Sequence, residues 1–155
     1  MSLGDGQTGL HSRDGLAVLV EHHMRRADRS GRPVSIVFVR LDNLAPPSSE
    51  RGDEADHLVV ETALVLKQAT RASDVLARVG RDQFCVLLAD AAEGSEEIVL
   101  TRLVEAIAGH NAGRVHVAPL ALSVGTATYS PEHPTSLDDL IANAEAQMPR
   151  RGDGA

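Results

Sequence analysis

Three short polar segments carry the side chains of this chain that could do chemistry. They are Arg40-Leu41-Asp42, Arg71-Ala72-Ser73-Asp74 and Gly80-Arg81-Asp82-Gln83-Phe84. Carboxylates such as those of Asp42 and Asp82 can hold a divalent cation, and an arginine can donate two parallel hydrogen bonds to a phosphate. Each segment also has a plainer interpretation. Glycine and aspartate are the residues that tight turns require, and an arginine three residues before an aspartate is a common pair in solvated loops.

The elements that must position these segments follow from the pattern of apolar residues. Helical spacing predicts helices over residues 15–27, 53–70, 95–108 and 136–148. Runs rich in β-branched residues predict strands over 34–39, 75–79, 84–88 and 115–129, the last interrupted near Pro119. The two middle strands flank a short polar connection and predict a β-hairpin. This order of elements favours a mixed sheet flanked by helices.

Composition and charge limit what the chain can bind. Its 155 residues, 43% of them hydrophobic, suit one globular domain. A net charge of −7 opposes binding to nucleic acid. Cys85 is the single cysteine, which excludes an internal disulfide and fits a reducing cytosol. No apolar run approaches the roughly 20 residues of a membrane helix. We therefore expect a cytoplasmic domain that contacts neither nucleic acid nor membrane.

Four segments, taken in order, resemble the GGDEF family of diguanylate cyclases. Residues 5–13 resemble the family's D-x-L-T-G-L-x-N-R opening, Arg40-Leu41-Asp42 its Asp-x-Asp step, Gly80-Arg81-Asp82-Gln83-Phe84 its signature hairpin, and Ser123-Val124-Gly125-Thr126-Ala127 its S-x-G-x-A strand. Each match alone is weak, but four in the right order and at family-like separations are specific.

The resemblance implies an architecture for almost the whole chain. Residues 5–148 are expected to form a single degenerate GGDEF domain, and residues 1–4 and 149–155 to be flexible termini or ends introduced by cloning. The implied fold class is α/β (α+β), the nucleotidyl-cyclase or ferredoxin-like palm, with a mixed sheet of about five strands flanked by helices.

The family's chemistry joins two GTP molecules into cyclic di-GMP, with divalent metals bridging the phosphate oxygens. By resemblance, the metal ligands fall on Arg40 and Asp82. A guanidinium cannot ligate a cation and stays protonated, so Arg40 should repel Mg²⁺. We expect no cofactor, and Mg²⁺ only if Asp42 and Asp82 retain residual activity. Arg40 could instead pair with Asp82, a fixed cation replacing the mobile one.

Other positions depart from the family in the same direction. Arg81 replaces the second signature glycine, and Gln83 replaces the signature glutamate. The guanine-recognising Asn and Asp fall on Ser48 and His57, which lack the paired hydrogen-bonding groups that guanine needs. Vestigial catalytic positions are therefore Arg40, Asp42, Gly80, Arg81, Asp82 and Gln83, with Ser48 and His57 as vestigial substrate positions, and the chain is not expected to be an active enzyme.

One functional motif of the family survives. Arg71-Ala72-Ser73-Asp74 matches its R-x-x-D product-inhibition site, five residues before Gly80. The resemblance implies that Arg71 can donate to a cyclic di-GMP phosphate or to the Hoogsteen edge of guanine, and that Asp74 can accept from guanine N1 and N2. Arg71 and Asp74 are the predicted cyclic di-GMP-binding residues.

Three hypotheses follow from these residues. The first is a catalytically degenerate GGDEF domain that serves as a regulatory module in bacterial cyclic di-GMP signalling, with cyclic di-GMP, other domains of a larger signalling protein and a second copy of the chain as its expected partners. The second is a diguanylate cyclase with residual activity. The third is a purely structural dimerisation domain that binds no nucleotide.

Overall fold

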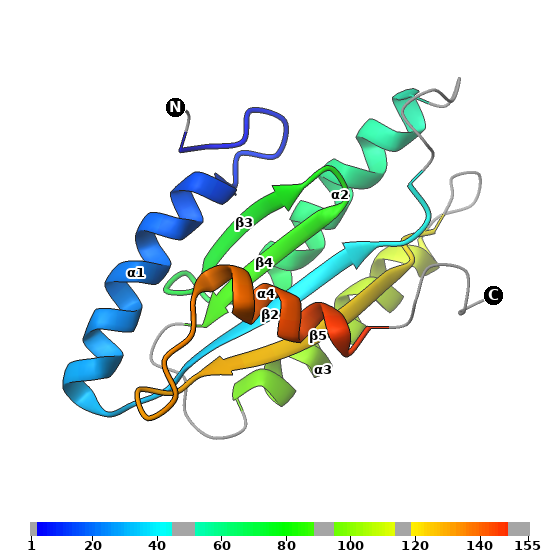
Figure 1. Ribbon diagram of the computed structural model, residues 1–155. Helices are drawn as coiled ribbons and strands as arrows, with labels where there is room; N and C mark the ends of the chain where they lie inside the picture. Colours follow the sequence, from blue (N-terminus) through cyan, green and yellow to red (C-terminus); the bar gives the residue numbers. More distant parts are fainter. Residues whose placement is uncertain (1–2, 45–51, 89–94, 114–118, 149–155) are drawn as a thin grey trace.

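A computed structural model describes residues 3–44, 52–88, 95–113 and 119–148 (Figure 1). The elements in chain order are β1 His11–Ser12, α1 Arg13–Ser30, β2 Val34–Leu41, α2 Gly52–Ala69, β3 Val75–Gly80, β4 Gln83–Leu88, α3 Ser95–Ala112, β5 Leu122–Tyr129 and α4 Leu137–Ala146. The strands form one mixed sheet in the order β1-β3-β4-β2-β5, in which only β1 and β3 run parallel. This arrangement confirms the predicted α+β palm.

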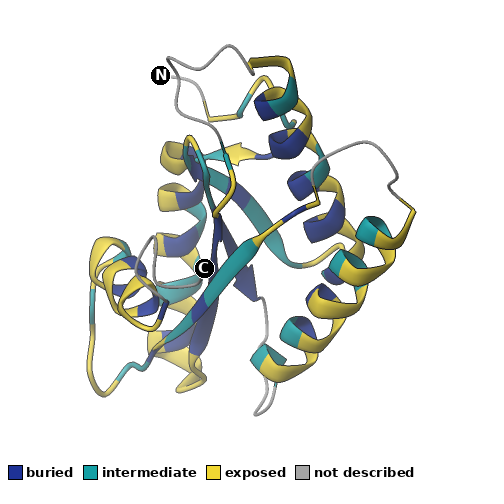
Figure 2. Cartoon of the chain, turned by 90° about the vertical axis from the view of Figure 1, so that its right-hand side faces the viewer, coloured by how far each residue is buried: buried dark blue, intermediate teal, exposed yellow. Residues whose placement is uncertain are grey.

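Helices cover both faces of the sheet, as the burial of the inner strand β2 shows. All eight residues of β2 are buried, and its side chains alternate between two hydrophobic clusters. Val37, Val39 and Leu41 pack with α2 and α3, whereas Ile36 and Phe38 pack with α1 and α4. A strand buried on both faces reads as a continuous apolar run in the sequence. Figure 2 shows this buried centre between helices that expose their outer faces.

Local capping fixes the ends of α1. The Ser12 hydroxyl accepts a hydrogen bond from the Gly15 amide at the N-terminus. At the C-terminus Gly31 adopts a left-handed φ of 75°, and its amide donates to the Ala27 carbonyl at 2.8 Å. A side chain at position 31 would be strained in this conformation. The glycine of the Ser-Gly-Arg-Pro segment is therefore the residue that ends α1.

Predicted and observed elements differ mainly at their ends. The helix predicted over 15–27 spans Arg13–Ser30, and the helix predicted over 95–108 extends to Ala112. The strand predicted over 115–129 is described from Leu122, and its residues 115–118 lie outside the described part. The two-residue strand β1 was not predicted, because so short a segment has no periodicity. Within the described residues, no helix is both long and apolar enough to cross a bilayer.

Gly125 sets how closely α4 approaches the sheet. A Cβ atom built at this position of β5 would overlap the carbonyl oxygen of Ala144 in α4. We expect Gly125→Ala to lower the free energy of unfolding by about 3 kcal/mol, the upper range of overpacking costs. Urea denaturation followed by circular dichroism measures this change.

Gly109 in α3 supplies the matched control for that experiment. A Cβ at Gly109 would meet no atom within 4 Å, so Gly109→Ala should stabilise by roughly 0.5–1 kcal/mol through helix propensity. Equal unfolding midpoints for Gly125→Ala and the parent protein would contradict the close approach of α4.

Cys85 is enclosed in the core, and its burial makes the thiol unreactive. Burial raises the pKa of Cys85 from an ordinary 9.0 to about 12, against a smaller lowering by the positive charge of Arg13. The native protein should therefore resist a thiol-reactive disulfide reagent at pH 8, and react fully in denaturant. Because only the unfolded chain ionises between pH 9 and 12, this thiol should also reduce stability as pH rises through that window. Fast labelling of the native protein would contradict the buried placement.

Candidate functional site

The sheet topology brings the family-like segments to one end of the sheet. Arg40 at the end of β2 lies opposite Gln83 of β4 on one side and Ser123 of β5 on the other. The Leu41 amide donates to the Asp82 carbonyl at 2.8 Å. Segments that are 40 residues or more apart in the sequence therefore meet at one end of the strands, beside the β3–β4 turn (Figure 1). This end of the sheet is called the edge below.

Arg40 fills the centre of this edge with a fixed positive charge. Its side chain is only 9% exposed, and its Nε donates to Asp42 Oδ1 at 2.8 Å. The second Asp42 oxygen accepts from the Ser123 hydroxyl at 2.5 Å. Both oxygens of the Asp42 carboxylate are therefore engaged within the protein. Arg40 and Asp82 each have further partners, and a direct pair between them stays a prediction.

The Arg40 guanidinium sets the local charge at this edge. A cation beside Asp42 would have to displace the Arg40 guanidinium or share the carboxylate with it, and like charges repel strongly at such distances. Across the described residues, no group of three or more His, Cys, Asp or Glu side chains could hold a metal ion. The residues of this edge therefore favour an internal ion pair.

The β3–β4 turn is tied to the N-terminal segment by one arginine. Arg78 donates from Nη2 to the Arg81 carbonyl at 2.8 Å and from Nη1 to Gln7 Oε1 at 2.6 Å, and Nη1 lies 3.5 Å from Asp5 Oδ2. Burial opposes the charge of Asp5, but hydrogen bonds from Thr8 and the charge of Arg78 outweigh it and hold the pKa of Asp5 below its ordinary value. The residues that resemble the family's opening motif therefore support the turn.

Gly80 closes the same turn at a bulge. The pairing of β3 and β4 shifts register between Arg78 and Gly80. A Cβ at Gly80 would lie 2.7 Å from Gln83 Oε1, the end of a flexible side chain, so the Gln83 side chain packs against this glycine and would have to shift if residue 80 had a Cβ. The glutamine that replaces the family's glutamate occupies the space above it.

The predicted guanine-recognising positions are only partly described. Ser48 lies outside the described residues. His57 is exposed near the start of α2, one residue after Asp56, whose Oδ1 accepts from Gln7 Nε2 at 2.9 Å. No described contact of His57 gives it a recognition role.

The Arg71–Asp74 turn joins α2 to β3, and its two charged side chains lie differently. The Asp74 side chain is 1% exposed, and its Oδ2 accepts from the Arg71 amide at 2.9 Å. The Asp74 amide in turn donates to the Arg71 carbonyl at 3.0 Å. The Arg71 side chain is 56% exposed, with Nη2 3.7 Å from Asp74 Oδ1. Asp74 therefore shapes the turn, and Arg71 presents its guanidinium to solvent.

Two hollows adjoin this turn. One, of about 130 Å³, is lined by Arg71, Asp74, Leu88, Ser95, Ile98, Val99 and Arg102. The other, of about 450 Å³, is lined by Gly9, Leu10, His11, Lys67, Thr70, Arg71, Ala72, Asp74 and Leu76. Arg102 of α3 was not predicted as a site residue. It lies 31 positions beyond Arg71 in the sequence, and only the fold brings the two arginines to one hollow.

Comparisons with known proteins agree with this architecture. The chain matches the family described as "Diguanylate cyclase, GGDEF domain" over residues 2–153. Over 150 residues it is 31% identical to the bifunctional diguanylate cyclase/cyclic di-GMP phosphodiesterase MucR of Pseudomonas aeruginosa. The aligned region covers 96% of this chain and 22% of MucR. The chain spans about a fifth of the length of the curated relatives it matches.

Solved structures with the same fold include two from Caulobacter crescentus. A sensory box/GGDEF family protein superposes with a TM-score of 0.76 at 28% identity, covering 99% of this chain and 100% of that one. The GGDEF domain of DgcB, solved in complex with c-di-GMP, superposes with a TM-score of 0.79 at 18% identity, covering 94% of this chain and 87% of that one. At 18% identity the likeness to DgcB concerns the fold alone.

Proposed function

Since this chain belongs to the GGDEF domain family of diguanylate cyclases, we propose that it is a regulatory domain of cyclic di-GMP signalling that binds cyclic di-GMP without making it. The observation that carries the proposal is the ion pair between Arg40 and Asp42, at the place where the family holds its metal. A fixed cation there removes the charge neutralisation on which phosphoryl transfer depends.

The magnitude of this effect is large. Two unit charges about 4 Å apart, at an effective dielectric constant near 20, interact by roughly 4 kcal/mol. The Arg40 side chain is only 9% exposed, so water screens its charge poorly. A Mg²⁺ ion carries twice the unit charge, and each Asp42 oxygen already accepts one hydrogen bond within the protein, so the ion would compete with Arg40 and Ser123 for the carboxylate. Metal-assisted attack on a nucleotide phosphate should therefore fail at this edge.

The neighbouring positions support the same conclusion. Arg81 stands where the family has its second signature glycine, so the turn backbone lacks the freedom to approach a phosphate closely. Gln83 removes a negative charge, and its side chain packs over Gly80. The exposed imidazole of His57 offers no paired acceptor to a guanine edge. Substrate recognition and metal binding are thus weakened together.

The Arg71 turn supplies the chemistry for binding the product. Cyclic di-GMP carries two phosphates and two guanine edges, each of which accepts paired hydrogen bonds from a guanidinium. Arg71 is exposed and adjoins Arg102 across the smaller hollow. We assign direct contact to Arg71 and Arg102. Asp74 holds the turn through Oδ2, which leaves Oδ1 as the oxygen that could accept from guanine. The DgcB domain, solved with c-di-GMP, has the same fold.

The wider setting is part of the proposal. Because the chain spans about a fifth of its curated relatives, we place it beside other domains of a larger cytoplasmic signalling protein, as a module that reports cyclic di-GMP to them. A second copy of the chain is a further proposed partner.

Equilibrium dialysis against labelled cyclic di-GMP tests the proposed function. We expect saturable retention by the protein that excess unlabelled cyclic di-GMP displaces and that GTP does not. Lack of retention even at high protein concentration would remove the binding function and favour a structural dimerisation domain.

A further inference from the structure

The sheet ends at β1 on one side and at β5 on the other, and these two outer strands differ greatly in length. β1 has two residues, whereas β5 pairs with β2 through eight consecutive positions. In Figure 2, β5 is the strand nearest the viewer, and its residues are mostly of intermediate exposure. Among the described residues, no strand pairs with the other side of β5. This open side of β5 is therefore a long row of backbone groups.

The hydrogen bonds of β5 show which of its backbone groups point to the open side. In an antiparallel ladder, alternate residues bond to the same neighbouring strand. The Asp42 amide donates to the Ala121 carbonyl at 2.8 Å, so the odd-numbered residues of β5 bond to β2 and the even-numbered residues point away. The Thr126 amide accordingly donates to Gln147 Oε1, just after α4, at 3.1 Å. Within the described ranges, no hydrogen bond satisfies the other outward amides, those of Leu122, Val124 and Thr128.

β5 lacks the features that usually keep an outer strand from pairing. Such strands are protected by charged side chains, prolines, bulges or a covering helix or loop. The sequence of β5, Leu-Ser-Val-Gly-Thr-Ala-Thr-Tyr, contains neither a charge nor a proline, and its pairing with β2 runs without a register shift. The Gln147 side chain protects one outward amide. Because this strip is uncharged, two chains can approach there despite the net charge of −7 on each.

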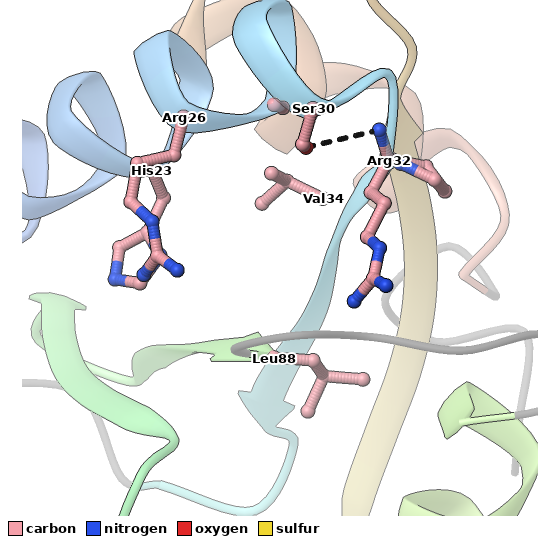
Figure 3. A pocket seen from close by; sticks show the side chains of 8 residues that line it. His23, Arg26, Ser30, Arg32, Val34 and Leu88 are labelled. Atoms are coloured by element: carbon pink, nitrogen blue, oxygen red, sulfur yellow. Dashed lines mark hydrogen bonds between the residues drawn. The ribbon is translucent and has the colours of Figure 1, made fainter.

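The far end of β5 is anchored to α1 and β2. Tyr129 lies opposite Val34, and its hydroxyl donates to Asp28 Oδ1 at 2.7 Å. Figure 3 shows Val34 just after the turn in which the Arg32 amide donates to the Ser30 hydroxyl at 3.2 Å. β5 is therefore held in position before any partner arrives, which reduces the ordering cost of pairing.

A second copy of β5 matches the open side in an antiparallel register. With a two-fold axis at Gly125, every outward residue of one copy meets an outward residue of the other. Leu122 then lies opposite Thr128 of the second copy, and Val124 lies opposite Thr126. Each of these pairs exchanges both of its N–H···O bonds. We propose that two copies of this chain associate through the open sides of β5, so that their sheets become one continuous sheet.

An exposed valine beside β5 suits this interface. Val104 of α3 is 67% exposed, and its spacing places it on the same helix face as Leu100 and Asn111. Leu100 packs against the cluster that Leu122 also contacts, and Asn111 Nδ2 donates to the Leu120 carbonyl at 3.1 Å. This face of α3 is therefore turned toward β5, and the second copy covers Val104.

Sedimentation velocity of the nucleotide-free protein, over a wide range of concentration, tests the proposal together with amide hydrogen exchange followed by nuclear magnetic resonance. The absence of cyclic di-GMP keeps this association separate from the proposed nucleotide site. We expect a reversible monomer–dimer equilibrium, with slower exchange of the Val124 and Thr128 amides as the dimer forms. A protein that stays monomeric overturns the proposal and leaves the open side to a segment of another protein. A dimer in which both amides exchange as fast as in the monomer overturns it too, because such a dimer uses another surface.

Gln147→Ala should strengthen the dimer, which a general loss of surface structure would not do. In the monomer, the Gln147 side chain competes for the Thr126 amide that the second copy needs. Removing this competitor from both copies should lower the Kd of the dimer roughly tenfold. An unchanged or higher Kd would contradict pairing through this amide.

A pair of matched variants locates the interface on the α3 side. Val104→Glu should raise the Kd of the dimer at least roughly tenfold, because it buries a charge without a partner. Val18→Glu adds the same charge at a valine of similar exposure, 59%, on α1, and it should leave the Kd unchanged. Equal weakening by the two variants would show a general charge effect and contradict the β5 interface.

Discussion

Incubated with GTP and Mg²⁺, this domain should form cyclic di-GMP at least about 10³-fold more slowly than an intact diguanylate cyclase domain. The expected factor follows from the roughly 4 kcal/mol repulsion between the Arg40 charge and a metal, at 1.36 kcal/mol for each tenfold in rate. Chromatographic separation of the nucleotides after incubation measures it, with an intact cyclase domain assayed in parallel. Turnover within tenfold of the intact domain would contradict the account.

Arg40→Asp tests the proposed loss of metal binding separately from the other proposed losses. The variant places two carboxylates, at positions 40 and 42, where the ion pair now stands. We expect Mn²⁺ to raise its melting temperature, because a ligand that binds only the folded state stabilises it. The parent protein should melt at the same temperature with and without Mn²⁺. Cyclase activity should remain low in Arg40→Asp, because Arg81, Gln83 and His57 are unchanged.

The second large effect concerns binding of the product. Arg71→Ala should weaken cyclic di-GMP binding by roughly 10–100-fold, because a charge-assisted contact contributes about 1.5–3 kcal/mol and each 1.4 kcal/mol is tenfold. Arg102→Ala should weaken it in the same direction if both arginines contact one ligand. Isothermal titration calorimetry measures both affinities.

A matched control isolates the effect of position from that of charge. Arg25 is exposed on α1 and pairs with Glu21 at 2.5 Å, so Arg25→Ala changes the net charge by the same amount away from the turn. Its affinity for cyclic di-GMP should equal that of the parent. If Arg71→Ala bound as tightly as Arg25→Ala, the ligand would not lie at the Arg71 turn.

Much of the fold could be predicted because the strongest signals are local. The apolar run of β2 predicts a strand buried on both faces, and the structure buries all eight of its residues. The helix predicted over 95–108 extends to Ala112, because tertiary packing adds turns that the apolar pattern does not require, whereas the helix predicted over 136–148 spans only Leu137–Ala146. The requirement for Gly125 could not be derived from periodicity, since it depends on the position of α4 in space.

Some features of the candidate site could likewise be predicted from the sequence, and others depend on the three-dimensional fold. Arg71 and Asp74 were singled out by the resemblance to the family's R-x-x-D motif, and the structure places both in one turn; their contact with a ligand stays a prediction. The inward position of the Asp74 carboxylate could not be predicted, since both an exposed and a buried aspartate fit that spacing. Arg102 joins the hollow only through the packing of α3. The Arg40–Asp42 pair joins the end of β2 to the loop that follows it. The sequence instead suggested a pair between Arg40 and Asp82 on the neighbouring turn, which stays a prediction.

The most direct test uses a single sample that can show synthesis and binding together. The protein is incubated with Mg²⁺, GTP and labelled cyclic di-GMP and then passed through a desalting column. The nucleotides are identified in the protein fraction and in the later small-molecule fraction, the filtrate. The account predicts cyclic di-GMP in the protein fraction, with GTP unconverted in the filtrate and no pyrophosphate released. GTP retained by the protein, or newly made cyclic di-GMP with pyrophosphate, would contradict a domain that binds the product without making it.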